Sequence, residues 1–122
     1  MTNKNDYKYI DLEYIYDMAD GDNDFMVEII GNFLEAMGPN MQKLYDAIAT
    51  NDRESIIFLA HKLKGSFRFV GCNREGAMME QIEELIGSDV DISEIKKIAD
   101  MVGDQFNNIQ NELIQFQNSI ND

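Results

Sequence analysis

Apolar residues recur at intervals of three and four positions along most of the 122-residue chain. This spacing places them on one face of an α-helix, whereas a half-buried β-strand would alternate apolar and polar residues, which no segment does convincingly. The pattern is most regular toward the C-terminus, where it is typical of a helix bundle or a coiled coil. That seam consists of Ile92, Ile95, Ala99, Val102, Phe106, Ile109, Leu113, Phe116 and Ile120.

Breaks in the pattern divide the N-terminal half into three predicted helices. The first spans about residues 6–18, with Ile10, Tyr14 and Met18 on one face. The segment DGDND then interrupts the pattern and supplies N-caps for a second helix over about residues 24–37. Because proline fits the first turn of a helix but not its interior, the segment GPN is predicted to separate the second helix from a third. The apolar face of the third helix comprises Met41, Leu44, Tyr45 and Ile48.

Capping residues predict the boundaries of the remaining helices. A fourth helix runs to about residue 70, where Gly71 ends it, and a fifth helix spans about residues 73–86. In each capping pair a polar N-cap precedes a glutamate that can bond back to the N-cap backbone. The two pairs are Asn51 with Glu54 before the fourth helix and Asp91 with Glu94 before the last.

The expected architecture is an all-α, antiparallel (up-down) four-helix bundle with an extra short N-terminal helix, forming a single domain over residues 1–122. This length suits one hydrophobic core. The sequence contains no internal repeat and no low-complexity tract.

Charge and composition narrow the possible functions. The formal net charge of −13 argues against sequence-independent binding of nucleic acid, which requires a surplus of Lys and Arg. Cys72 is the only cysteine, which fits a reducing compartment. The longest apolar run, residues 56–60, is far too short to span a membrane, and the N-terminal residues do not resemble a signal peptide. We therefore expect a cytoplasmic protein that does not bind membranes.

The stretch AHKLKGSFRFVG contains the only histidine of the chain, His61. On a helical wheel the apolar residues of this helix fall about 180° to 260° away from His61, which therefore points away from the buried stripe. Lys64, Gly65 and Arg68 lie within about 60° of His61, so the four residues share one outward face. The apolar stripe consists of Ile56, Ala60, Leu63, Phe67 and Val70.

Two further features mark this face as a candidate docking surface. Ile57 and Phe58 flank it with apolar side chains that the buried stripe does not include. No Asp or Glu occurs between Ser55 and Arg74, although acids outnumber bases 23 to 10 in the whole chain. Such a local excess of positive charge would stabilise an anion carried on His61.

These residue types permit phosphoryl transfer. A neutral imidazole nitrogen is a good nucleophile toward an activated phosphoryl group, and an unperturbed histidine is largely neutral at pH 7. Lys64, one turn beyond His61, can neutralise the charge that develops on the phosphoryl oxygens. Gly65 costs about 1 kcal/mol relative to alanine inside an exposed helix, and its lack of a side chain leaves room for another protein.

Other interpretations remain open. A lone exposed histidine is usually an ordinary surface residue, Lys64 and Arg68 can form a solvated face, and Gly65 can serve helix packing. The same basic patch can also dock a signalling partner without phosphorylation, as in a helical adaptor. The alternating acids of DGDND resemble the start of a calcium loop, but Phe25 and Gly31 stand where that loop requires glycine and glutamate, so no metal site is predicted.

The sequence HKLKGS, residues 61–66, resembles the core motif of the histidine-containing phosphotransfer (HPt) domains of two-component phosphorelays. Gly71 and the pair Ile82-Glu83 match later positions of that motif. The resemblance implies that His61 is phosphorylated and that Lys64 stabilises the transferring phosphoryl group. It further implies that Glu83 accepts the Nδ1–H of His61, which fixes the tautomer and leaves Nε2 as the nucleophile.

The resemblance also implies partners and the absence of certain activities. The expected partners are receiver domains of response regulators or hybrid histidine kinases, which dock on Ile57, Phe58, Lys64, Gly65 and Arg68. The chain contains no P-loop, so it is expected to be a monomeric phosphoryl carrier with no cofactor and no ATP-dependent kinase activity. Phe67, Cys72 and Glu75 depart from the residues usual in the family, which leaves the local packing and the partner preference open.

Overall fold

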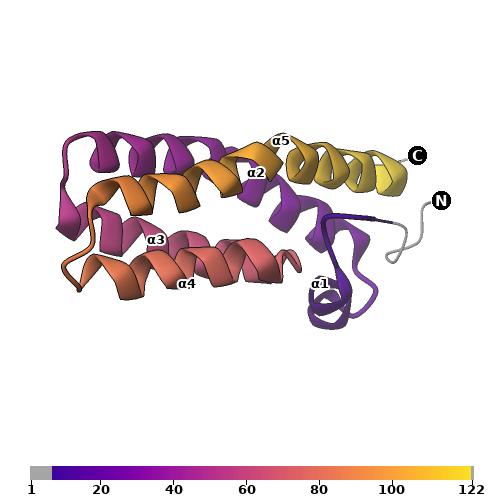
Figure 1. Cartoon of the computed structure of the whole chain (residues 1–122). Helices are drawn as coiled ribbons and strands as arrows, with labels where there is room; N and C mark the ends of the chain where they lie inside the picture. Colours follow the sequence, from indigo (N-terminus) through magenta and orange to yellow (C-terminus); the bar gives the residue numbers. More distant parts are fainter. Residues whose placement is uncertain (1–6, 122) are drawn as a thin grey trace.

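The computed structural model describes residues 7–121, which form five α-helices (Figure 1). Helices α2, α3, α4 and α5 alternate in direction, are joined by short connections and form a bundle, while α1 lies at one end of it. The predicted all-α bundle is therefore confirmed. The helices are α1 (Glu13–Ala19), α2 (Asn23–Ala49), α3 (Arg53–Phe69), α4 (Asn73–Ile86) and α5 (Ile92–Asn121).

Helix α2 corrects the prediction that GPN separates two helices. It continues through Pro39, which lies in its interior. A proline there removes the hydrogen bond to the carbonyl of Glu35 and costs about 3 kcal/mol. The apolar spacing continues across the break, however, and Met37, Met41 and Leu44 are all buried. Because burying each of these side chains contributes about 1.5–3 kcal/mol, tertiary packing outweighs the local cost.

The prediction of the first helix was also wrong in its start and in its buried face. Helix α1 begins at Glu13, and Tyr14 is exposed, whereas Ile15 is fully buried. The described residues before α1 are held by Glu112 of α5, whose carboxylate accepts hydrogen bonds from the backbone N–H groups of residues 8, 9 and 10 at 2.9, 2.7 and 3.2 Å. The Glu112 carboxylate therefore satisfies backbone N–H groups that would otherwise need partners within a helix. Position 6, the predicted start, lies outside the described residues.

The two remaining residues of the predicted apolar face of the first helix differ in burial. Ile10 is buried, but it precedes the helix, and Met18 is exposed at 43%. Leu12 and Ala19 are buried instead, so the face that packs on the bundle is shifted by one residue from the predicted one. The exposed side of α1 therefore carries large apolar side chains.

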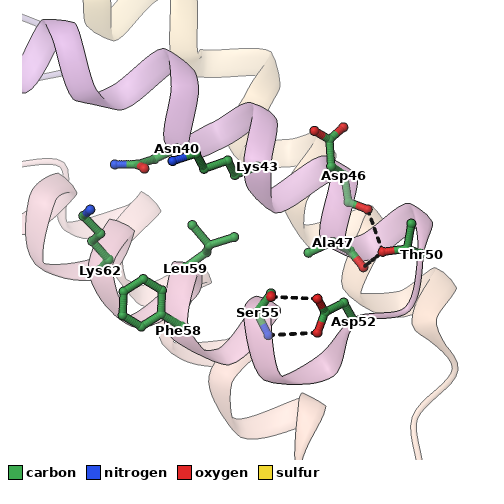
Figure 2. Close-up of a pocket in the computed structure, with 10 residues that line it drawn as sticks. All are labelled: Asn40, Lys43, Asp46, Ala47, Thr50, Asp52, Ser55, Phe58, Leu59 and Lys62. Atoms are coloured by element: carbon green, nitrogen blue, oxygen red, sulfur yellow. Dashed lines mark hydrogen bonds between the residues drawn. The ribbon is translucent and has the colours of Figure 1, made fainter.

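An aspartate caps the N-terminus of α3, and a glycine ends the helix at its C-terminus. Its N-cap is Asp52 rather than Asn51, because the Asp52 carboxylate accepts hydrogen bonds from the backbone N–H and the hydroxyl of Ser55 (Figure 2). Asn51 instead adopts a left-handed conformation with φ of 52° after α2. At the other end, Gly71 has φ of 77°, and a Cβ there would overlap the backbone of Asp11. The predicted stop at Gly71 is confirmed.

The bounds of α4 match the prediction, and α5 begins beside its predicted cap. Asp91 accepts a hydrogen bond from the backbone N–H of Ser93, but Glu94 pairs with Lys97 at 3.2 Å instead of bonding back to the cap. Most of the predicted α5 seam is buried in the common core of the bundle, with Ile92, Phe106 and Ile120 partly buried at its margins. Within residues 7–121, no helix has the length and apolar content that crossing a membrane requires.

Candidate functional site

Helix α3 presents His61 to solvent because its opposite side is buried. The predicted apolar stripe of this helix, including Ile56, Leu63 and Phe67, is almost completely inaccessible to solvent. His61 lies on the far side of the helix, and its side chain is 71% exposed. The outward orientation predicted from the helical wheel is therefore what the fold produces.

Glu83 of α4 lies beside His61. Ile82 is fully buried, so its neighbour Glu83 lies at the edge of α4 that faces α3. The Oε2 atom of Glu83 is 3.1 Å from Nδ1 of His61. An ionised carboxylate can only accept hydrogen bonds, so this contact requires the proton of the neutral imidazole to be on Nδ1. The lone pair then lies on Nε2, the nitrogen on the far side of the ring.

Lys64 binds the other oxygen of the same carboxylate. Its Nζ atom is 2.8 Å from Oε1 of Glu83, and both side chains are only about a fifth exposed, at 19% and 20%. A single carboxylate thus holds both His61 and Lys64. The predicted acid-free window is acid-free in sequence but not in space, because α4 brings Glu83 against it.

The environment of Glu83 keeps its carboxyl group ionised. Burial acts to raise the pKa of Glu83, but hydrogen bonds from Lys64 and His61 and their charges outweigh burial, so the pKa lies below its ordinary value. A lowered pKa means that the ionised carboxylate stabilises the folded protein above the ordinary pKa of glutamate. That contribution is lost as the pH falls through the lowered pKa.

Gly65 and Arg68 occupy the same outward face but differ in their surroundings. Apart from its chain neighbours and the backbone of its own helix, no atom lies within 4 Å of the position that a Cβ of Gly65 would take, so this glycine faces solvent rather than a neighbouring helix. Arg68 pairs with Glu80 of α4, with 3.0 Å between its guanidinium nitrogen and the carboxylate oxygen. Arg68 is therefore drawn toward α4.

Apolar side chains surround this face. Ile57 and Phe58 are exposed at 44% and 66%. Helix α1 adds Tyr14, which is 60% exposed and packs edge-to-face on Phe69 with ring centroids 5.5 Å apart. Tyr14 and Phe69 line a hollow of about 330 Å³ together with Gly65 and Arg68. The sequence pattern does not associate Tyr14 with this site, because no local feature indicates against which helix α1 packs.

The three residues that depart from the family pattern are all buried. Phe67 belongs to the stripe of α3 that faces the core, and Glu75 is 6% exposed in the first turn of α4. Cys72 donates its S–H to the backbone oxygen of Tyr9 at 3.3 Å, and burial raises the pKa of its thiol to about 12. These residues therefore act on the packing around the ends of α3 and α4.

The acids of DGDND have structural roles at helix ends. Asp20 is the left-handed C-cap of α1, and Asp22 caps α2 by accepting a hydrogen bond from the backbone N–H of Phe25. Over the part of the chain that the structure describes, no group of three or more His, Cys, Asp or Glu side chains is arranged to hold a metal ion.

Comparisons with known proteins give one family and one relative. Residues 28–119 match the model of the Hpt domain. The chain is also similar to the phosphorelay intermediate protein rdeA of Dictyostelium discoideum, with 21% identity over 82 residues. That match covers 67% of this chain and 32% of the relative, so the chain spans about a third of the relative's length. No solved structure matches the chain.

Replacing Gly65 with alanine should raise the free energy of unfolding by about 0.5–1 kcal/mol, because alanine restricts the unfolded chain and meets no atom in the folded one. Gly71→Ala is the matched control and should lower the free energy of unfolding, since φ there is 77° and the new Cβ would overlap Asp11. Urea denaturation measures both. A destabilised Gly65→Ala variant would identify Gly65 as a packing residue instead.

Removing the Glu83 carboxylate should change the tautomer of His61. Two-dimensional ¹H–¹⁵N correlation of the imidazole ring at about pH 8, where an ordinary histidine is neutral, should show Nδ1–H as the main form in the wild type. Glu83→Ala should shift the population toward Nε2–H, and Glu83→Gln, which retains an acceptor, should shift it less. Glu84→Ala, an exposed neighbour, is the control. Identical ring spectra for all four proteins would exclude Glu83 as the group that orients His61.

Proposed function

The chain belongs to the Hpt domain family, and from that membership we propose that His61 carries a phosphoryl group between the aspartates of receiver domains. Histidine phosphotransfer in two-component phosphorelays is the activity of this family. The observation that carries the assignment to His61 is the pairing of its Nδ1 with Glu83, which leaves Nε2 on an exposed ring as the nucleophile.

The proposed transfer needs only His61 and the aspartyl phosphate of a receiver as reactants. Nε2 of His61 attacks the phosphorus of an aspartyl phosphate, so a P–N bond forms while the P–O bond to the aspartate breaks. The aspartate leaves as a carboxylate, and the ring becomes a phosphorylated imidazolium that keeps its proton on Nδ1. Glu83 stabilises the positive charge that develops on the ring. The reverse reaction delivers the phosphoryl group to the next aspartate.

Lys64 supports the transfer as the cation that shares the Glu83 carboxylate with His61. Phosphoryl transfer spreads negative charge over the equatorial oxygens, and enzymes for such reactions depend mainly on positioning and on charge stabilisation. Lys64 lies one turn beyond His61 and is held by Glu83 at 2.8 Å. It can reach the phosphoryl oxygens once it exchanges this carboxylate for them.

The partners and the setting follow from this reaction. We infer that receiver domains of response regulators or hybrid histidine kinases dock over Ile57, Phe58, Lys64, Gly65 and Arg68, and that Mg²⁺ for the transfer belongs to the receiver. The protein works as a carrier without kinase activity of its own, as a monomer in the cytoplasm. The similarity to rdeA, a phosphorelay intermediate protein, supports the same kind of role.

His61→Gln should fold as the wild type does but accept no phosphoryl group, because the exposed side chain contributes nothing to the core. The test uses receiver domains phosphorylated with acetyl phosphate and Mg²⁺, followed by detection of acid-labile phosphate on the protein. A variant that still becomes labelled would place the phosphate elsewhere. A wild type that binds receivers but never becomes labelled would favour the unphosphorylated adaptor.

Lys64→Ala should slow phosphoryl transfer by about tenfold to a thousandfold, since a charged group aimed at the reacting centre commonly contributes a few kcal/mol. Arg68→Ala is the control, because Arg68 is engaged by Glu80 and should change the rate less. Single-turnover transfer at saturating receiver measures the chemical step for both variants. Equal rates for Lys64→Ala and the wild type would remove Lys64 from the reaction.

A further inference from the structure

A groove of about 420 Å³ lies between α2 and α3, beside the phosphorylation face (Figure 2). Phe58 forms part of its wall and is, at 66%, the most exposed large apolar side chain among the described residues. Lys62 of α3 and Lys43 of α2 also line the groove. Ile57, the residue before Phe58, is also exposed at 44%, so two adjacent apolar side chains form a patch at the surface of α3, as is common at sites that bind another protein.

The groove lies close to His61 along α3. Phe58 lies one turn before His61 on the same face of α3, a separation of about 5–6 Å. Packed helices lie about 8–10 Å apart, which places α2 close by as well. A specific interface buries roughly 800 Å² on each partner, which is a patch of about 16 Å radius. An interface of this size centred on His61 would reach Phe58 and Lys62, which line the groove.

Two lysines and two aspartates line the groove, and they are separated along it. Asp52 is occupied by Ser55 of its own helix, at 3.2 and 2.7 Å, and Asp46 accepts a hydrogen bond from Gln42 at 3.0 Å. Neither Lys43 nor Lys62 forms an ion pair with any residue that the structure describes. In Figure 2 both lysine side chains extend toward one end of the groove, while Asp46 and Asp52 lie toward the other.

We propose that this groove receives, from the docked receiver, an apolar side chain flanked by a carboxylate. Phe58 contacts the apolar side chain, and Lys43 and Lys62 pair with the carboxylate. The inference rests on the proposed function and adds to it a second helix, α2, that selects the partner. Lys43 and Lys62 act on binding and not on the chemical step, because charges at the rim of an interface mainly change the rate of association and its salt dependence.

The experiment measures transfer from a panel of receiver domains, phosphorylated with acetyl phosphate and Mg²⁺, to the full chain. Lys43→Glu and Lys62→Glu should each lower the second-order rate constant by about tenfold at low salt, and less at higher salt. The rate at saturating receiver should stay at the wild-type value. Phe58→Ala should lower the second-order rate constant at all salt concentrations. Lys97→Glu makes the same charge change on α5 and should have less than about a twofold effect.

The outcomes distinguish this inference from the function on which it rests. A wild type that accepts phosphate from no receiver would overturn both. A labelled wild type together with Lys43→Glu, Lys62→Glu and Phe58→Ala variants that match it would overturn the groove alone. Equal losses in Lys43→Glu and Lys97→Glu would mean a general charge effect and also overturn it. Thermal melting of each variant, followed by circular dichroism, is the control for folding. An unfolded variant would melt at a lower temperature and would also have a lower rate at saturating receiver.

Discussion

The apolar stripe of α3 must be removed from water, and α2 and α4 are the neighbouring helices against which it packs. This burial determines the rotation of α3 about its axis. With the stripe inside, His61 and Gly65 must face outward, Lys64 must lie at the α4 side, and Phe58 and Lys62 must lie at the α2 side. The His61 ring, the Lys64 ammonium group and the groove are thus positioned by one packing requirement.

The second determinant is the carboxylate of Glu83, which serves two donors. It holds the His61 ring in one tautomer and keeps the Lys64 ammonium group within reach of the site. Its two oxygens therefore link the side chains of two residues that lie one turn apart on α3 to a single position on α4.

Local patterns predicted the parts of the site that depend on a single helix. The outward position of His61, the stop at Gly71 and the bounds of α4 follow from periodicity and capping. Errors arose where a distant contact prevailed over a local rule. Pro39 predicts a break between two helices because the local sequence does not show how α2 packs against other helices. The start of α1 was misread because Glu112, about a hundred residues away, bonds the preceding backbone.

Contacts between helices also explain why some residues of the candidate site are not predicted from local sequence patterns. Glu83 was identified through its place in the family motif, since nothing in its own helix separates it from Glu80 or Glu84. Lys43 and Tyr14 were not associated with the site at all, because each reaches it through the folding of another helix onto α3. Residues that act across helices require the tertiary structure.

The exposure of His61 also has a consequence for the proposed phosphoryl group. With 71% of the side chain in contact with solvent, a phosphorylated ring would be surrounded by water from the moment it forms. Hydrolysis would then compete with delivery, because no enclosure within residues 7–121 shields the ring. The lifetime of the signal would depend on how often an acceptor collides with this face. A cell could therefore adjust the efficiency of the relay through the concentration of the acceptor alone.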